Sequence, residues 1–272
     1  SLVGWALVLM LVDLWIPRGR KGIMALLSAV GLVVAMGCTL LLAGQKMTAF
    51  NGMLAVDGFS LALDMLFLVS GLAAIALAYN WLNRTGLERA EYYTLLLFSI
   101  SGMMLMAHAY DLIIVFLALE LLSIPLYILA GFYRDRAESE EASLKYFLLG
   151  AFAGGFVLYG IAMVFGATAR TDLPGIFEVM QSGKGNLVLF GVGAALILVG
   201  LGFKVAAFPF HKWVPDVYQG APSPVTAFMS VAVKAAGFAA LLRVFVTAVP
   251  SLAPQLTPVL WVLSALTMIA GN

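Results

Sequence analysis

Three ionisable residues lie inside long apolar segments, where no bulk water is at hand to stabilise a charge. Glu120 lies about 12 Å from the start of the segment 112–133, close to the middle of a ~30 Å hydrocarbon layer. Lys204 and Lys234 lie inside two later apolar segments. Each charge at the centre of a membrane-spanning helix costs about 2.5–3.5 kcal/mol. Residues kept at that cost are typical of proton and ion pathways, and proton transfer is the chemistry we expect here.

Lysine and glutamate suit that chemistry. Desolvation lowers the pKa of a lysine and raises that of a glutamate, so both groups move toward neutrality. Arginine could not take this part, because its guanidinium keeps its proton. Two lysines and one glutamate also leave one base without an acidic partner. The alternative is that the charges only pair and hold helices together, although a buried ion pair is weak evidence for stability.

The segment that carries Lys204 is expected to be discontinuous. Pro209 follows five residues later, and a proline removes a backbone hydrogen bond and clashes with the preceding turn. Broken helices at membrane depth occur where the backbone lines a wet cavity or an ion site. His211, just beyond the predicted break, could relay protons because its intrinsic pKa is near neutral. The alternative for His211 is an interfacial loop position.

Two further residues are secondary candidates for proton translocation. Lys145 stands near the start of its apolar segment, where a lysine can also snorkel to the interface. Asp64 follows Asp57 by seven residues, near the outer end of its segment. We expect His108 and Asp111 to occupy a tight, solvated hairpin.

Composition excludes several other classes of protein. Of 272 residues, 63% are hydrophobic and 11% charged, whereas a soluble domain is about half apolar and a quarter charged. A net charge of +1 argues against nucleic acid as a partner. One cysteine and two histidines argue against a disulfide framework and a transition-metal site. We find no phosphate-binding loop or nucleophile elbow, so the chain is not expected to be an enzyme on its own.

The apolar segments predict an all-α polytopic membrane protein with about nine transmembrane helices, one of them discontinuous. A span needs about 20 residues, and lipid tolerates no unpaired backbone groups. The predicted spans are 1–16, 23–44, 59–81, 92–107, 112–133, 144–168, 187–210, 225–247 and 256–271. Small residues at Gly150, Gly154, Gly191, Gly193, Gly200 and Gly202 are expected to allow close helix packing.

Basic residues predict the orientation. Nine fall on one side of the membrane, namely Arg18, Arg20, Lys21, Arg84, Arg89, Arg134, Arg136, Lys145 and Lys212. Four fall on the other, namely Lys46, Arg170, Lys184 and Arg243. The positive-inside rule places the first side in the cytoplasm and the amino terminus on the periplasmic side. The chain begins at Ser1 within an apolar segment and ends at Asn272 within another, which predicts a fragment of a longer sequence.

Several motifs resemble one family. The stretch 198–243, LVGLGFKVAAFPFHKWVPDVYQGAPSPVTAFMSVAVKAAGFAALLR, resembles the core of the antiporter-like subunits of respiratory complex I. Its DVYQGAP segment, together with EASLKYFLLGAFAGGFVLYG (141–160) and VDGFS (56–60), most resembles subunit N of bacterial NADH–quinone oxidoreductase, in its amino-terminal portion. The resemblance runs from about Val56 to the end of the chain.

The resemblance implies a fourteen-helix subunit with two inverted five-helix repeats, each with a broken helix. It matches Glu120, Lys204 and Lys234 to the family's proton-carrying residues, and His211 to the histidine after the break. It divides the chain into three amino-terminal helices (1–89), a first repeat (90–248) and the start of a second (249–272).

The resemblance also implies a non-redox subunit of a translocase, without a cofactor of its own. Its implied partners are other membrane-arm subunits and the lipid of the bacterial inner (plasma) membrane, with quinone reached only indirectly. Two alternatives stay open. One is a subunit of a multi-subunit Na⁺/H⁺ antiporter, which the DVYQGAP segment disfavours, and the other is a structural membrane-arm subunit.

Overall fold

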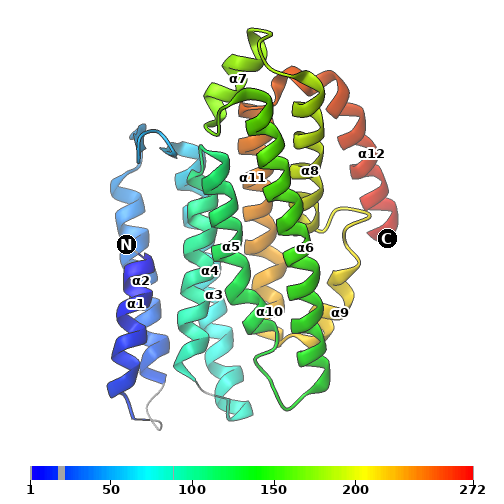
Figure 1. The fold of residues 1–272 in the computed structure, drawn as a ribbon. Helices are drawn as coiled ribbons and strands as arrows, with labels where there is room; N and C mark the ends of the chain where they lie inside the picture. Colours follow the sequence, from blue (N-terminus) through cyan, green and yellow to red (C-terminus); the bar gives the residue numbers. More distant parts are fainter. Residues whose placement is uncertain (1, 18–21, 88, 272) are drawn as a thin grey trace.

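The computed structural model describes residues 2–17, 22–87 and 89–271 of the chain. Ser1, Asn272 and three basic residues used to predict the orientation, Arg18, Arg20 and Lys21, lie outside the described residues. The structure is a helical bundle, as predicted, and it also contains one short β-hairpin that was not predicted (Figure 1).

The elements follow one another along the chain in this order: α1 (Leu2–Val12), η1 (Asp13–Trp15), α2 (Gly22–Leu41), β1 (Met47–Ala49), β2 (Leu54–Val56), α3 (Gly58–Thr85), α4 (Ala90–His108), α5 (Leu112–Ala130), α6 (Ala137–Thr168), α7 (Leu173–Gln181), α8 (Leu187–Val205), α9 (Trp213–Gly220), α10 (Ser223–Phe228), η3 (Met229–Val233), α11 (Lys234–Thr247), η4 (Pro250–Leu252) and α12 (Ala253–Gly271).

Within the described residues, eight helices are long and apolar enough to cross a membrane, and a shorter apolar helix covers Leu2–Trp15. Large apolar side chains are exposed along their outer faces, among them Phe152, Leu148 and Leu117. In water such apolar surfaces would associate with one another. The outer faces of the bundle are therefore suited to contact with lipid.

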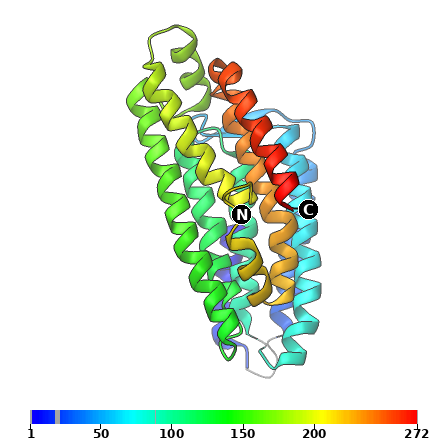
Figure 2. The same ribbon diagram turned by 90° about the vertical axis from the view of Figure 1, so that its right-hand side faces the viewer.

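The helices stand side by side, with α1 and α2 at one edge of the bundle and α12 at the opposite edge (Figure 1). α6 packs most extensively against α8, and α4 against α5. α8 ends midway along the bundle, and the chain continues through an irregular segment into α9 (Figure 2). The predicted discontinuous helix is therefore confirmed, although it ends at Val205 instead of at the prolines.

α6 also differs from its predicted span, because it begins at Ala137 and not at 144. The extra turns are polar and carry Glu138 and Glu140 at the start of the helix. Carboxylates there interact favourably with the positive end of the helix dipole. Because these turns are polar, the pattern of apolar residues could not predict them as part of the helix.

One end of the bundle, which we call the hairpin end, is held together by backbone hydrogen bonds. β1 pairs with β2 in antiparallel register, Met47 opposite Val56. The backbone N–H of Tyr110 donates to the carbonyl of Met53 (2.9 Å), and the N–H of Leu112 donates to the carbonyl of Thr171 (2.9 Å). These bonds join the hairpin, the α4–α5 connection and the segment before α7. The hairpin end corresponds to the predicted periplasmic side.

Glycines let α6 and α8 cross at close range. A Cβ atom built on Gly160 would lie 2.8 Å from the carbonyl oxygen of Gly193, and a Cβ atom on Gly193 would lie 2.8 Å from that of Gly160. Gly200 meets the carbonyl oxygen of Ala153 in the same way, at 2.7 Å. The predicted close packing is confirmed for Gly193 and Gly200, whereas nothing lies within 4 Å of such an atom on Gly191.

Candidate functional site

Lys204 lies in the last turn of α8, at the point where the helix stops in the middle of the bundle. Ala206 takes a left-handed conformation (φ 61°) and ends the helix. Two of the backbone carbonyls freed by the break have partners, since Ala207 N–H donates to the Gly202 carbonyl (2.9 Å) and Trp213 Nε1 donates to that of Phe203 (3.1 Å). The lysine therefore stands at a well-formed helix end inside the protein.

The Lys204 ammonium has neutral hydrogen-bond partners. Only 2% of the residue is exposed, and its Nζ donates to the hydroxyl of Ser123 (2.7 Å) and to that of Tyr146 (3.2 Å). The ring faces of Tyr127 and Tyr146 lie 5.9 and 5.3 Å from Nζ, within the range of cation–π attraction. Ser123 gives its own proton to the Leu119 carbonyl, so it can only accept from the lysine.

Glu120 and Lys204 line one small internal cavity between α5, α6 and α8. Its volume is about 10 Å³, which is about the space that one water molecule needs. Glu120 packs on α6 at Gly154, where a Cβ atom would lie 2.7 Å from its Oε1. In the described part of the chain, no direct ion pair joins Glu120 to Lys204. Both side chains thus border a space about the size of one water molecule.

Lys234 lies in the next long helix, directly after the π-helical turn η3. Such wide turns are frequent at functional sites. The residue is half-buried, and its Nζ lies 5.7 Å from the centre of the Tyr218 ring. Gly237, one turn further on, packs against the stem of Lys204, because a Cβ atom there would lie 3.6 Å from the lysine's Cβ and Cγ. The structure thus brings the helix of Lys234 against Lys204.

His211 lies in the irregular segment between α8 and α9, as the predicted break requires. Its ring stacks on Phe208, with ring centres 5.5 Å apart. Its Nδ1 is buried and has no hydrogen-bond partner among the described residues. Pro209 itself follows a cis peptide bond in the same segment, and the Phe208 N–H donates to Thr267 of α12 (3.0 Å).

The secondary candidates lie away from Lys204. The side chain of Lys145 is 40% exposed and forms ion pairs with Glu141 (2.6 Å) and Asp216 (2.5 Å), an arrangement that fits a lysine at the interface. Asp64 is buried near the hairpin end, where its Oδ2 contacts His108 Nε2 at 2.8 Å.

The prediction that His108 and Asp111 are solvated was wrong. The side chain of His108 contacts Asp64. Asp111 is buried as the N-cap of α5, where its carboxylate accepts hydrogen bonds from the Ile113 N–H and the Thr171 hydroxyl. Arg243, which was counted among the basic residues of the periplasmic side, is also buried and binds Asp57 with both terminal nitrogens (2.7 Å each). A helix end that packs against other helix ends buries such groups, and the sequence does not show which ends meet.

Sequence reasoning also missed Tyr146 and Trp213. Tyr146 is fully buried, binds Lys204 and stacks on Trp213 with ring centres 4.8 Å apart. A tyrosine in an apolar segment needs a partner for its hydroxyl, and this requirement could have marked Tyr146. Among the described residues, no group of three or more His, Cys, Asp or Glu side chains could hold a metal ion.

Known proteins share this arrangement of helices and its sequence. Residues 109–272 match the family described as NADH:quinone oxidoreductase/Mrp antiporter, TM. The match covers more than half of the chain and includes the helices that carry Glu120, Lys204 and Lys234. The chain belongs to this antiporter-like family.

Individual relatives in the antiporter-like family confirm the predicted resemblance to subunit N. The chain is 49% identical over 274 residues to NADH-quinone oxidoreductase subunit N of Chloroflexus aggregans, covering 99% of this chain and 56% of that protein. It is 48% identical over 272 residues to subunit N 2 of Roseiflexus castenholzii, covering 99% and 55%. A chain of respiratory complex I from Thermus thermophilus has a TM-score of 0.84 at 40% identity, covering 100% of this chain and 56% of that one.

This member of the antiporter-like family spans about half the length of the curated relatives that it matches. Its central groups are a buried amine, a carboxylate that lines the same small cavity, a serine hydroxyl that accepts from the amine, and a tyrosine hydroxyl that can accept or donate. Such a set can hold, release and pass on protons with small movements of hydrogen atoms.

Proposed function

We propose that this chain carries protons across the membrane as part of a membrane-arm subunit of NADH:quinone oxidoreductase, in which quinone is reduced elsewhere in the complex. The observation that carries the proposal is the surroundings of Lys204, a buried amine held at a helix break by two hydroxyl groups. The subunit N relatives support the assignment to this complex.

The hydroxyl of Tyr146 can serve both protonation states of Lys204. It accepts a hydrogen bond from the ammonium, and it can turn and donate to the neutral amine. A carboxylate in direct contact would instead favour the charged form strongly. The neutral surroundings therefore allow Lys204 to gain and lose a proton without loss of its hydrogen bonds.

We assign the route to the residues that lie around this lysine. Glu120 is the neighbour across the water-sized cavity, the helix of Lys234 packs on Lys204 at Gly237, and His211 follows the break. In this proposal Lys145 and Asp64 are not part of that line, because Lys145 is exposed and Asp64 lies at the hairpin end.

The remaining parts of the proposal follow from the family. The partners are other complex I subunits of the membrane arm and the lipids of the inner (plasma) membrane, and quinone is not bound by this chain. The chain holds no cofactor, and the hairpin end faces the periplasm. The divisions at residues 89 and 248 separate the first three helices, a first repeat and the start of a second.

The test uses the full-length subunit in the assembled complex, reconstituted into vesicles. Lys204→Ala and Glu120→Ala are expected to leave assembly intact and to reduce proton uptake or coupled quinone reduction, measured by a pH-sensitive dye and by NADH oxidation. Lys184→Ala, an exposed lysine in the loop before α8, is the matched control and should pump normally. Full coupled activity in both site variants would contradict the proposal.

A Na⁺/H⁺ antiporter subunit is the second candidate, since the family description names both kinds of protein. The same vesicles distinguish the two. Proton uptake driven by NADH in the absence of Na⁺ supports the oxidoreductase, whereas proton movement driven by a Na⁺ gradient without NADH supports the antiporter.

A further inference from the structure

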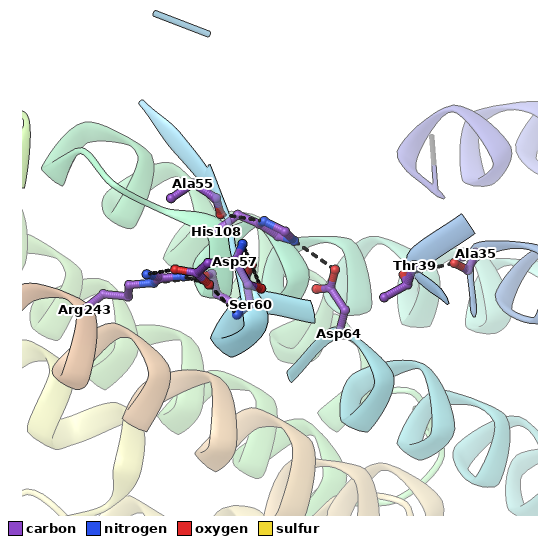
Figure 3. Close-up of polar contacts among 9 residues, drawn as sticks. Ala35, Thr39, Ala55, Asp57, Ser60, Asp64, His108 and Arg243 are labelled. Carbon is purple, nitrogen blue, oxygen red and sulfur yellow. Dashed lines mark hydrogen bonds and ion pairs between the residues drawn. The ribbon is translucent and has the colours of Figure 1, made fainter. Parts of the chain in front are cut away.

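Asp64 of α3 and His108 of α4 form a largely buried pair near the hairpin end (Figure 3). Neither residue lines the small cavity that Glu120 and Lys204 share. The Asp64 side chain is 4% exposed. Both ring nitrogens of His108 contact oxygen atoms, since Nδ1 lies 2.9 Å from the carbonyl oxygen of Ala55 and Nε2 lies 2.8 Å from Asp64 Oδ2.

These two contacts fix the number of protons on the pair. A carbonyl oxygen only accepts, so His108 Nδ1 must carry hydrogen. The contact between Nε2 and Oδ2 then needs a second hydrogen, either on the ring or on the carboxyl group. Without it, two lone pairs would face each other inside the protein. The pair therefore holds one shared proton.

The charges around the pair lead to the same conclusion. Arg243 of α11 lies near the pair, because its Nε donates to the carbonyl of Ala107, the residue before His108 (3.0 Å). The positive charge of Arg243 is balanced by its ion pair with Asp57. The residues of α1 and α2 nearest to Asp64 carry no charge, and they include Trp5 and Thr39. With Arg243 already paired, Asp64 and His108 are neutral together only when they share a proton.

A half-open pocket beside Asp64 gives this proton a way to exchange. Asp64 Oδ1 is buried and has no hydrogen-bond partner among the described residues. It borders a cavity of about 390 Å³ between α1, α2, α3 and α4, whose lining is mostly apolar and whose polar side includes Asp64, His108 and Thr39. That volume holds several water molecules at about 30 Å³ each. Water at Oδ1 would satisfy the carboxylate and reach the shared proton.

We propose that Asp64 and His108 form a second proton-binding site, which exchanges its proton with water in the cavity between α1 and α4. The ligand is a proton taken up from water. The site is separate from the groups around Lys204. The inference does not rest on the proposed function, because the pair would hold its proton in a chain that pumps nothing.

The test counts protons on the full-length protein in lipid vesicles at neutral pH, without turnover. Nitrogen-15 NMR of labelled histidine reports the hydrogens on His108, assigned by their loss in His108→Gln. Infrared spectroscopy reports a protonated carboxyl group. We expect one hydrogen on Nδ1 and one more on Nε2 or Asp64, and we expect Asp64→Asn to remove the second. Asp172→Asn, a surface carboxylate at the same end, is the control and should change nothing.

An unprotonated Nε2 with no protonated carboxyl band would overturn the proposal, and so would a second hydrogen that persists in Asp64→Asn. The exchange route is tested on the same NMR signals with Ala35→Phe, which fills the cavity. Loss of fast exchange with water supports the route, with Val33→Phe on the exposed face of α2 as the matched control. Exchange as fast as in the unmodified protein would overturn the route through the cavity.

Discussion

At the scale of single residues, hydrogen bonds at the hairpin end keep the Asp57 side chain negatively charged. Arg243 and Asp57 form a bidentate ion pair. The Asp57 side chain also caps α3, because it accepts a hydrogen bond from the Ser60 N–H (2.8 Å). Burial raises the pKa of Asp57, but these hydrogen bonds outweigh burial and lower the pKa from 3.8 to about 2. The carboxylate thus stays charged in the folded protein far into acid.

This shift predicts a pH dependence of stability. A lowered pKa in the folded state stabilises the fold fully above the unfolded value and loses that contribution as pH falls through the folded value. We expect a loss of about 1 kcal/mol between about pH 4 and pH 2, reduced by solvent at this half-buried group. Unfolding in detergent at several pH values measures it, and Asp57→Asn, which still caps the helix, should remove that dependence. An equally steep loss in the variant would contradict the prediction.

Some of these residues could be predicted from the sequence and others could not. The placement of Glu120, Lys204 and Lys234 within long helices was predictable, because a charge inside an apolar segment is visible in the sequence alone. Tyr146 and the pairing of Asp64 with His108 were not, because a contact between two helices depends on how each is rotated about its axis. Almost every face of these helices is apolar, so periodicity gives little information on rotation.

At the scale of the helices, close crossings decide where the central groups meet. Gly160 and Gly193 allow the backbones of α6 and α8 to touch, and this places Tyr146 of α6 beside Lys204 of α8. Hydrophobic association cannot drive such contacts in lipid, so backbone proximity and packing must supply them.

Gly160→Ala is therefore expected to destabilise the bundle by about 1–3 kcal/mol, because its Cβ would meet backbone atoms that cannot move aside. Gly155→Ala in the same helix is the matched control, since nothing lies within 4 Å of a Cβ there. Alanine should even favour that helix slightly. Thermal unfolding in detergent gives both values, and equal stability of the two variants would argue against the crossing.

Helix ends were predicted less well than helices. Prolines after Lys204 indicated a break, but α8 stops earlier, at Val205, where Ala206 turns left-handed. The π-helical turn before Lys234 has no signal in the sequence, because it inserts one residue without any glycine or proline to mark it. Such local choices depend on tertiary packing, which overrides short-range preference.

At the scale of the whole molecule, the ionisable groups that the described residues bury wholly or in part lie mainly at two places. One surrounds Lys204, where a helix ends midway through the bundle (Figure 2). The other lies at the hairpin end, where Asp57, Asp64, His108 and Arg243 meet (Figure 3). The rest of the surface between the ends is apolar, which suits lipid or neighbouring helices. Proton movement is therefore expected to involve buried groups and not the outer faces.

Lys204→Arg tests the central proposal most directly, because arginine keeps the positive charge but does not release its proton. The measurement is the ratio of protons pumped to NADH oxidised by the assembled complex in vesicles. If Lys204 gains and loses a proton during turnover, the ratio falls while the complex stays assembled. If the charge only holds helices together, the ratio stays at the wild-type value, and that result would contradict the account.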